Sequence, residues 1–266
     1  MIYFSSLLYA NPIYKPAGDR LCNAVNSCGI PYSFLKHTND IWVRDFMPVK
    51  TQSGKYVSFR YEPSYLVDYP QFKTDFRVDI NEQLPLERIV YSDINLDGGN
   101  VVFSPSKTKA VISDRVFTEN ENYAPAELIQ ELERLIEAQI IIIPSLRSEM
   151  TGHADGMVRF ISENVAIGNV SHSAYGLEAK IRKTLRNHGI KMLDFPYFSS
   201  SKDSAVGCYL NYLETAQHLF LPVFGVQMDR EAITSAESIF QKTIVPVVIN
   251  EIAEHGGVLN CISWEC

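Results

Sequence analysis

The chain has 266 residues, of which 46% are hydrophobic and 21% charged, so it can bury a sizeable core as one large domain or two small ones. Its formal net charge of -7, with no Lys/Arg cluster longer than a pair, argues against a nucleic-acid partner and favours a small cationic ligand. No segment approaches the roughly 20 apolar residues that span a bilayer, so no membrane partner is expected.

The five cysteines form an odd set without a CxxC pair: Cys22, Cys28, Cys208, Cys261 and Cys266. Such a set is typical of reduced thiols in the cytoplasm rather than of a disulfide framework. A zinc site is the weaker interpretation, because Cys22 and Cys28 fall at the ends of a predicted helix. We therefore expect a cytoplasmic protein without a metal.

The first half of the chain predicts strands separated by weaker helical signals. Residues 1–12 have no basic start and their apolar run is interrupted by serines, which favours a first buried strand over a signal peptide. Residues 18–29 predict a helix that leads into a strand at 30–35. Residues 62–86 should hold the next helix, but their prolines oppose it.

The second half repeats one order, a helix followed by a strand. Residues 125–139 have apolar side chains at 128, 129, 132, 135 and 136, the spacing of an amphipathic helix with proline in its first turn, and "IIIIP" follows. Residues 173–189, with Ser173 as a candidate cap and Gly189 at the end, lead into "IKMLDFP". Residues 229–241 lead into "TIVPVVI" in the same way.

A polar stretch follows each of these strands, and its focal residue recurs at an even spacing. The focal residues are Asp45, Asp97, His153, Cys208 and Cys261, which are separated by 52, 56, 55 and 53 positions. A period of about 50 residues is typical of repeat architectures, and five modules closed into a ring would bring these points to one axis. With no flexible linker in the sequence, we predict one domain over residues 1–266.

Three of the acids are the most informative residues. Isolated acids are costly to bury, and Asp45, Asp97 and Asp155 would repel one another on a shared axis unless a cation came between them. Guanidinium fits best, because its planar N–H donors match carboxylates bidentately. For Asp97 alone, a hairpin turn in "LDGG" is the competing interpretation. Arg44 and Arg159 are expected to be structural partners of these acids.

Cys261 and His153 are the candidate nucleophile and proton carrier. Gly256 and Gly257 would let the backbone turn tightly and leave the Cys261 thiol exposed in a pocket, although a buried core cysteine is the alternative. His153 can move protons near neutral pH, as a thiol nucleophile and a poor leaving group both require. His153 and Asp155, two apart on an expected strand, would point to the same side.

Four elements, in the correct order, resemble those of agmatine deiminases and bacterial peptidylarginine deiminases. "NDIWVRDFMP" is similar to W-x-R-D-x-G-P, "LDGGN" to E-G-G-N/S, "GHADGMVRF" to G-H-x-D-x-x-x-R-F and "GGVLNCISW" to G-G-x-I-H-C-I-T. "VGCYLNYL" also resembles their S-Y-x-N-F-Y segment. The resemblance covers nearly the whole chain. It implies the α/β class and the fivefold pseudosymmetric α/β propeller of the guanidine-modifying superfamily.

The resemblance also implies an activity, hydrolytic deimination of a guanidinium group, and a role for each matching residue. Cys261 would be the nucleophile and His153 the general acid and base. Asp45 and Asp155 would clamp the guanidinium, and Asp97 would take the position of the family glutamate, one methylene shorter. Trp42 is either a core residue or a substrate contact at the entrance. No metal or organic cofactor is implied.

Several alternatives remain open at this point. Within the superfamily, the substrate could be agmatine, free arginine, a C-terminal arginine of a peptide or methylarginine, and an amidinotransferase could pass the amidino group to an amine. A non-catalytic guanidinium-binding protein of the same fold is a further alternative, against which both Cys261 and His153 argue. A metal hydrolase using His153, Asp155 and Cys208 lacks supporting spacing. A homo-oligomer is left open.

Overall fold

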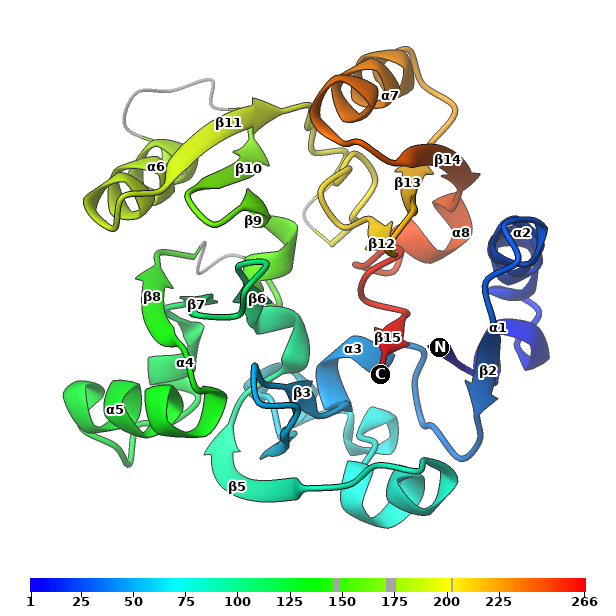
Figure 1. Ribbon diagram of the computed structural model, residues 1–266. Helices are drawn as coiled ribbons and strands as arrows, with labels where there is room; N and C mark the ends of the chain where they lie inside the picture. The colour runs from blue at the N-terminus through cyan, green and yellow to red at the C-terminus, as the bar shows by residue number, and fades with distance from the viewer. Residues whose placement is uncertain (146–148, 171–175, 202) are drawn as a thin grey trace. The chain divides into compact units, whose positions relative to one another are not determined.

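The computed structural model describes residues 1–145, 149–170, 176–201 and 203–266, and it is a mixed α/β protein (Figure 1). The chain contains two compact units, one made of residues 1–44 and 195–266 and the other of residues 45–194. Within the described ranges, no helix combines the length and the apolar character needed to cross a membrane. The single domain over residues 1–266 stays a prediction.

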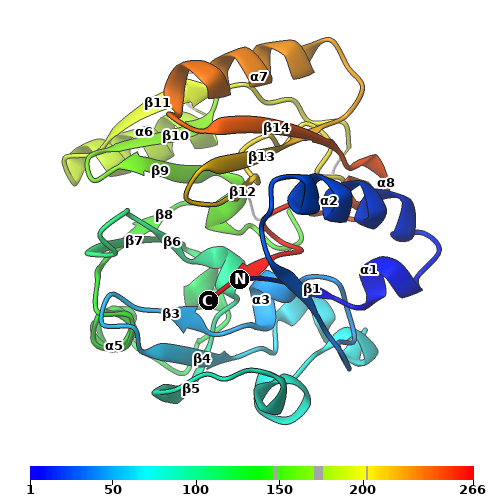
Figure 2. The ribbon, with the colours of Figure 1, turned by 45° about the vertical axis from the view of Figure 1, so that its right-hand side comes forward.

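The first unit contains two three-stranded sheets. One is ordered β15-β1-β2, from Trp264–Glu265, Ile2–Ser5 and Tyr32–Leu35. The other is ordered β12-β13-β14, from Leu213–Glu214, His218–Val223 and Thr243–Val248. Four helices accompany them: α1 (Leu7–Ala10), α2 (Lys15–Ser27), α7 (Met228–Ile239) and α8 (Asn250–Ala253). Figure 2 shows α7 running along β14, which it contacts.

The second unit contains three sheets of the same size. They are β3-β4-β5 (Val49–Lys50, Tyr56–Arg60, Ile89–Asn95), β6-β7-β8 (Val102–Phe103, Lys109–Ser113, Gln139–Ile143) and β9-β10-β11 (Val158–Ser162, Val165–Asn169, Lys191–Phe195). The regular helices are α4 (Arg115–Thr118), α5 (Pro125–Ile136) and α6 (Leu177–Asn187). The short helix α3 (Val43–Phe46) crosses from the first unit into the second.

The sheets repeat one strand order, as the predicted modules require. A strand pairs antiparallel with the middle strand in all five sheets of the described chain, and in four of them the third strand is recorded as parallel to the middle one. Each focal residue lies three to five positions before the strand that opens the antiparallel pair. The mixed α/β class and the repeat are therefore confirmed, whereas the closed propeller stays a prediction.

Helix α5 shows why the sequence pattern could be interpreted correctly. Its buried residues are Leu128, Leu132, Leu135 and Ile136, and Ile129 packs against the same core, so the predicted apolar face is confirmed. This core joins α5 to sheets β3-β4-β5 and β6-β7-β8. A second core joins β6-β7-β8 to β9-β10-β11 and α6. The candidate cap Ser173 lies outside the described residues.

The helix expected in residues 62–86 is absent as a regular helix. The segment instead holds four short turns: η1 (Ser64–Leu66), η2 (Pro70–Phe72), the π turn η3 (Phe76–Ile80) and η4 (Asn81–Gln83). Pro63 and Pro70 stand at the start of two of them, where the missing N–H is tolerated, and they prevent one continuous helix. This departure brings a further side chain to the candidate site.

Candidate functional site

Four predicted site residues meet inside the second unit. Asp45, Asp97, His153 and Asp155 are each no more than 8% exposed. They come from three short helical turns: α3, η5 (Gly98–Asn100) and η6 (Ala154–Gly156). Each turn precedes the first strand of a different sheet, so the repeat itself brings the four side chains together.

Asp97 and His153 occupy equivalent positions and contact each other. Each is the residue before a 3-10 turn, with extended backbone, and neither side chain caps its own turn. Instead, Asp97 Oδ2 and His153 Nε2 lie 2.8 Å apart in a buried hydrogen bond. A short carboxylate–imidazole contact of this kind fixes the orientation of the ring. The hairpin alternative for "LDGG" is therefore wrong, because Asp97 opens a helical turn.

Asp45 faces the other ring nitrogen of His153. Asp45 Oδ1 lies 3.5 Å from His153 Nδ1 and accepts a hydrogen bond from Gly99 N at 3.2 Å. A Cβ atom on Gly99 would lie 2.5 Å from Asp45 Oδ1, 2.9 Å from His153 Nδ1 and 3.5 Å from Asp155 Oδ2. Only glycine therefore fits where these three side chains converge.

Asn100 ties two of the turns together. Its Oδ1 accepts hydrogen bonds from the backbone N–H of Ser113 at 2.9 Å and of Ala154 at 3.2 Å. Ala154 follows His153 directly, so the turn that carries His153 is fixed to the turn that carries Asp97. Sequence reasoning quoted "LDGGN" without assigning a role to Gly99 or Asn100, although both lie inside the quoted element.

Burial and mutual repulsion perturb the protonation of this cluster. Burial raises the pKa of Asp45 to about 7, with help from the charges of Asp97 and Asp155 and against that of His153. Burial alone would lower the pKa of His153, but the three aspartates outweigh it and raise that pKa to about 9. One imidazolium among three acids leaves an excess of negative charge, which favours a cationic ligand.

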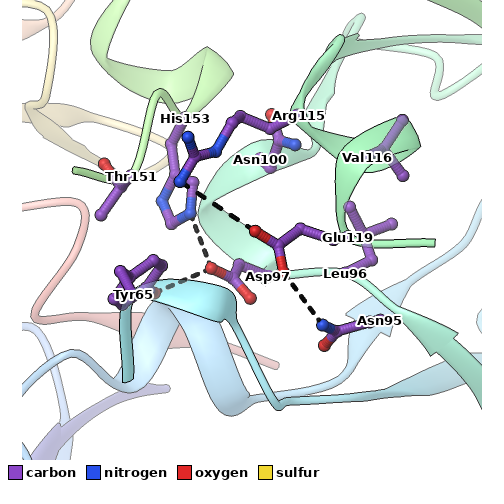
Figure 3. Close-up of a pocket in the computed structure, with 10 residues that line it drawn as sticks. All are labelled: Tyr65, Asn95, Leu96, Asp97, Asn100, Arg115, Val116, Glu119, Thr151 and His153. Atoms are coloured by element: carbon purple, nitrogen blue, oxygen red, sulfur yellow. Dashed lines mark hydrogen bonds and ion pairs between the residues drawn. The ribbon is translucent and has the colours of Figure 1, made fainter. Parts of the chain in front are cut away.

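A small, partly open pocket adjoins Asp97 and His153 (Figure 3). Tyr65 of η1 lines it, and the Tyr65 hydroxyl donates to Asp97 Oδ2 at 2.8 Å, the same oxygen that contacts His153. Arg115 and Glu119 line the pocket as well, with Arg115 Nη2 4.0 Å from Glu119 Oε1. Sequence reasoning missed Tyr65, because nothing in the proline-rich segment predicts this long-range contact.

Cys261 and Trp42 belong to the first unit. Cys261 lies in a turn before β15 and is half-buried, and its N–H donates to Asn211 Oδ1 at 3.2 Å. Gly256 has a φ of 100°, and a Cβ on Gly257 would lie 2.5 Å from the Trp42 ring and 3.1 Å from Cys261 Cβ. The paired glycines therefore allow a tight turn, as expected, whereas a Cys261 thiol exposed in a pocket stays a prediction. Half-buried Trp42 packs beside this turn.

The structure corrects two expectations about neighbouring residues. His153 and Asp155 do not lie on a strand: they belong to the η6 turn, and β9 begins only at Val158. Arg44 does not pair with the aspartates, because its guanidinium binds Glu265 of β15 at 2.8 Å. Arg159 lies on β9.

Within the described ranges, no group of three or more His, Cys, Asp or Glu side chains is arranged to hold a metal ion. Cys208, the third ligand of the metal-hydrolase alternative, is a buried residue of the first unit, whereas His153 and Asp155 belong to the second.

Comparisons with known proteins agree with these features. A family model described as Porphyromonas-type peptidyl-arginine deiminase matches residues 15–266. Among curated proteins, no sequence matches the chain.

Several solved structures are similar to this one. The agmatine deiminase of C. jejuni has a TM-score of 0.77 and 17% identity, over 99% of this chain and 92% of that one. The agmatine deiminase of Enterococcus faecalis has a TM-score of 0.74 and 16% identity, over 99% and 92%. A DDAH from Pseudomonas aeruginosa, complexed with citrulline, has a TM-score of 0.62 and 9% identity, over 98% and 97%. At these identities the likeness shows a common fold.

Proposed function

The chain belongs to the Porphyromonas-type peptidyl-arginine deiminase family, and on this premise we propose that it hydrolyses the guanidinium group of an agmatine- or arginine-like substrate. The products are a ureido compound and ammonia. The observation that carries the proposal is the cluster of three buried aspartates around His153, which holds more negative charge than its own imidazolium can balance. A flat cation with several N–H donors balances it.

In the first step, Asp45 and Asp155 hold the guanidinium while the Cys261 thiolate attacks its central carbon. A new C–S bond forms and the C=N electrons move onto nitrogen. His153 carries a proton at neutral pH, because its pKa is about 9. It gives this proton to the departing nitrogen, which leaves as ammonia. The positive charge of substrate and imidazolium favours the thiolate form of the nucleophile.

In the second step, water replaces the sulfur. The S-alkylthiouronium intermediate is attacked at the same carbon by a water molecule, and His153, now neutral, takes a proton from that water. The C–S bond breaks, the thiolate is restored, and the proton left on the new hydroxyl passes through solvent to the released ammonia. One guanidinium ion and one water become one ureido group and one ammonium ion.

This mechanism requires Cys261 to meet the aspartate cluster, and two features support that requirement. Arg44, whose N–H donates to the Cys261 carbonyl oxygen at 3.1 Å, directly precedes Asp45 in the chain. Cys261 also lies in a turn just before a strand, three positions ahead of β15, as Asp45, Asp97 and His153 lie four or five positions ahead of theirs. We propose that the five modules stand round one axis as a propeller, which would bring these equivalent turns together. The proposed setting is the cytoplasm, on the cysteine usage of the sequence.

A screen for ammonia release tests the proposed function and narrows the substrate. The panel contains agmatine, arginine, arginine-terminated peptides and methylarginines, and amines added as acceptors detect amidino transfer. We expect release from at least one member, with a matching amount of ureido product. No release from any member, with tight binding of one of them, would instead identify a guanidinium-binding protein.

Gly99→Ala is expected to lower the rate of deimination by about 100-fold, because the added Cβ displaces Asp45 and His153 from their reacting positions. Crowding should also lower the free energy of unfolding by about 1–3 kcal/mol. The matched control is Gly189→Ala, where φ is 73° and no atom lies within 4 Å of the added Cβ. That control should lose stability but keep its activity per folded molecule. Normal activity in Gly99→Ala would contradict the geometry.

Ligand binding is expected to depend on pH through Asp45. Below its pKa of about 7, Asp45 is protonated and must release that proton to pair with a guanidinium. Affinity of Cys261→Ala protein for agmatine should therefore rise between about pH 6 and about pH 8, and binding should release protons. Isothermal titration calorimetry in two buffers of different ionisation enthalpy measures both. Asp45→Asn should remove this dependence of affinity on pH. If affinity still rises with pH in that variant, another group is responsible for the rise.

A further inference from the structure

Tyr65 reaches the candidate site from a segment that replaces the regular helix of its module. Its hydroxyl donates to Asp97 Oδ2 at 2.8 Å, and its ring lies edge-on to the His153 ring with centroids 6.4 Å apart. Figure 3 shows the Tyr65 and His153 side chains converging on one oxygen of the Asp97 carboxylate. Nothing in the reaction steps above uses this side chain.

The backbone just before Tyr65 is held in place at two residues. Glu62 N donates to Asn95 Oδ1 at 2.9 Å, and Asn95 Nδ2 donates to the Glu62 carbonyl oxygen at 2.7 Å. Ser64 N and Ser64 Oγ donate to the Glu119 carboxylate at 2.9 and 2.6 Å. These four bonds position the phenol in advance, so its contact with Asp97 requires little further ordering.

We propose that Tyr65 is a positioning residue that holds Asp97 against His153 and shares with His153 one carboxylate oxygen, so that it sets the pH at which His153 gives up its proton. The inference rests on the proposed function of His153. Two donors on one oxygen divide its negative charge between them, so each receives less of it than it would alone. Asp97 is one methylene shorter than glutamate, and the tyrosine fixes this short side chain from the pocket side.

The hydroxyl stays a donor throughout the working pH range. Burial, followed by the charge of Asp97 and contacts with Tyr61, raises the pKa of Tyr65 well above its ordinary value. The other charged groups near His153 are Asp45 from α3 and Asp155 from η6, together with two residues that line the pocket, Arg115 of α4 and Glu119 directly after α4. Of these contacts, the Tyr65 hydroxyl can be removed without changing any formal charge.

The test is the Tyr65→Phe variant. The first measurement is an NMR titration of labelled histidine in the protein without substrate. The His153 signal is assigned by its absence from the spectrum of His153→Asn. Without the hydroxyl, His153 becomes the principal donor to Asp97 Oδ2, and we expect its pKa to rise by roughly half a unit to one unit. The matched control is Tyr69→Phe, which removes a phenol hydroxyl from an exposed residue of the same segment and should leave the titration unchanged. An unchanged or lowered His153 pKa in Tyr65→Phe overturns the proposal.

A double-mutant cycle separates positioning from general support of the fold. In an Asp97→Asn background, where the negative charge is gone, Tyr65→Phe should no longer shift the His153 titration. A shift of equal size in both backgrounds overturns the role through Asp97. In kinetics, Tyr65→Phe should move the alkaline limb of the kcat/KM profile, which reports the free enzyme, upward by the same amount, with KM within about twofold of the wild type. The NMR readout needs no turnover, so it decides the matter even if no substrate on the panel is deiminated.

Discussion

Cys261→Ala is expected to abolish ammonia release, with a loss of at least about 10⁴-fold in kcat, because without the thiolate no covalent intermediate can form. The aspartate cluster is untouched by this change, so guanidinium binding should persist. Ammonia release is measured with a coupled assay, and mass spectrometry of quenched wild-type enzyme should detect an adduct equal to the substrate less ammonia. The adduct should be missing from the variant.

The matched control for this experiment is Cys208→Ala. Cys208 has the equivalent position in the preceding module, five residues before its strand, but its side chain is buried at 9% exposure. Its loss should leave turnover near the wild-type level, at a modest cost in stability. Retained activity in Cys261→Ala, or equal loss in both variants, would refute the assignment of the nucleophile.

His153→Asn is expected to lower kcat by about 10² to 10⁴-fold, because both proton transfers then depend on solvent. The wild-type profile of kcat/KM should be bell-shaped. It should rise through about pH 7, as Asp45 ionises and can pair with the substrate, and fall through about pH 9, as His153 loses the proton it donates. In the variant the alkaline limb should disappear.

The control variant is His188→Asn. His188 is an exposed residue after α6 and bonds the Thr184 carbonyl oxygen of its own helix, so this change should leave both limbs in place. A His153→Asn enzyme with near-normal kcat would mean that another group carries the proton. An alkaline limb that persists in it would belong to some other residue.

Local periodicity explains what the sequence predicted well. The α5 face at Leu128, Leu132 and Leu135 was visible because burial follows the helical repeat, and the site residues were visible because the modules repeat at about 50 positions. The structure around Pro63 and Pro70 could not be predicted, because prolines oppose a long helix but do not specify what replaces it.

Contacts across long stretches of sequence were the other limit. The Tyr65–Asp97 hydrogen bond joins residues 32 positions apart, and the Arg44–Glu265 bond joins residues 221 positions apart. Neither pairing follows from a local sequence pattern. The sequence predicts a strand at His153, because its polar residues adjoin the strand-like "MVRF", whereas the structure has a turn there. His153 and Asp155 still reach Asp45 and Asp97, because the turn before β9, rather than the strand itself, carries them.

The contrast in polarity between the aspartate cluster and the two apolar cores of the second unit has a practical consequence for protein engineering. Leu132 and Ile141 belong to those cores and stabilise the sheets, whereas Asp45 and Asp155 bring like charges together at buried positions and oppose folding. A directed-evolution screen that rewards heat resistance alone would therefore discard these acids first. Selection for higher thermal stability must therefore include selection for catalytic turnover, because otherwise it will enrich inactive variants.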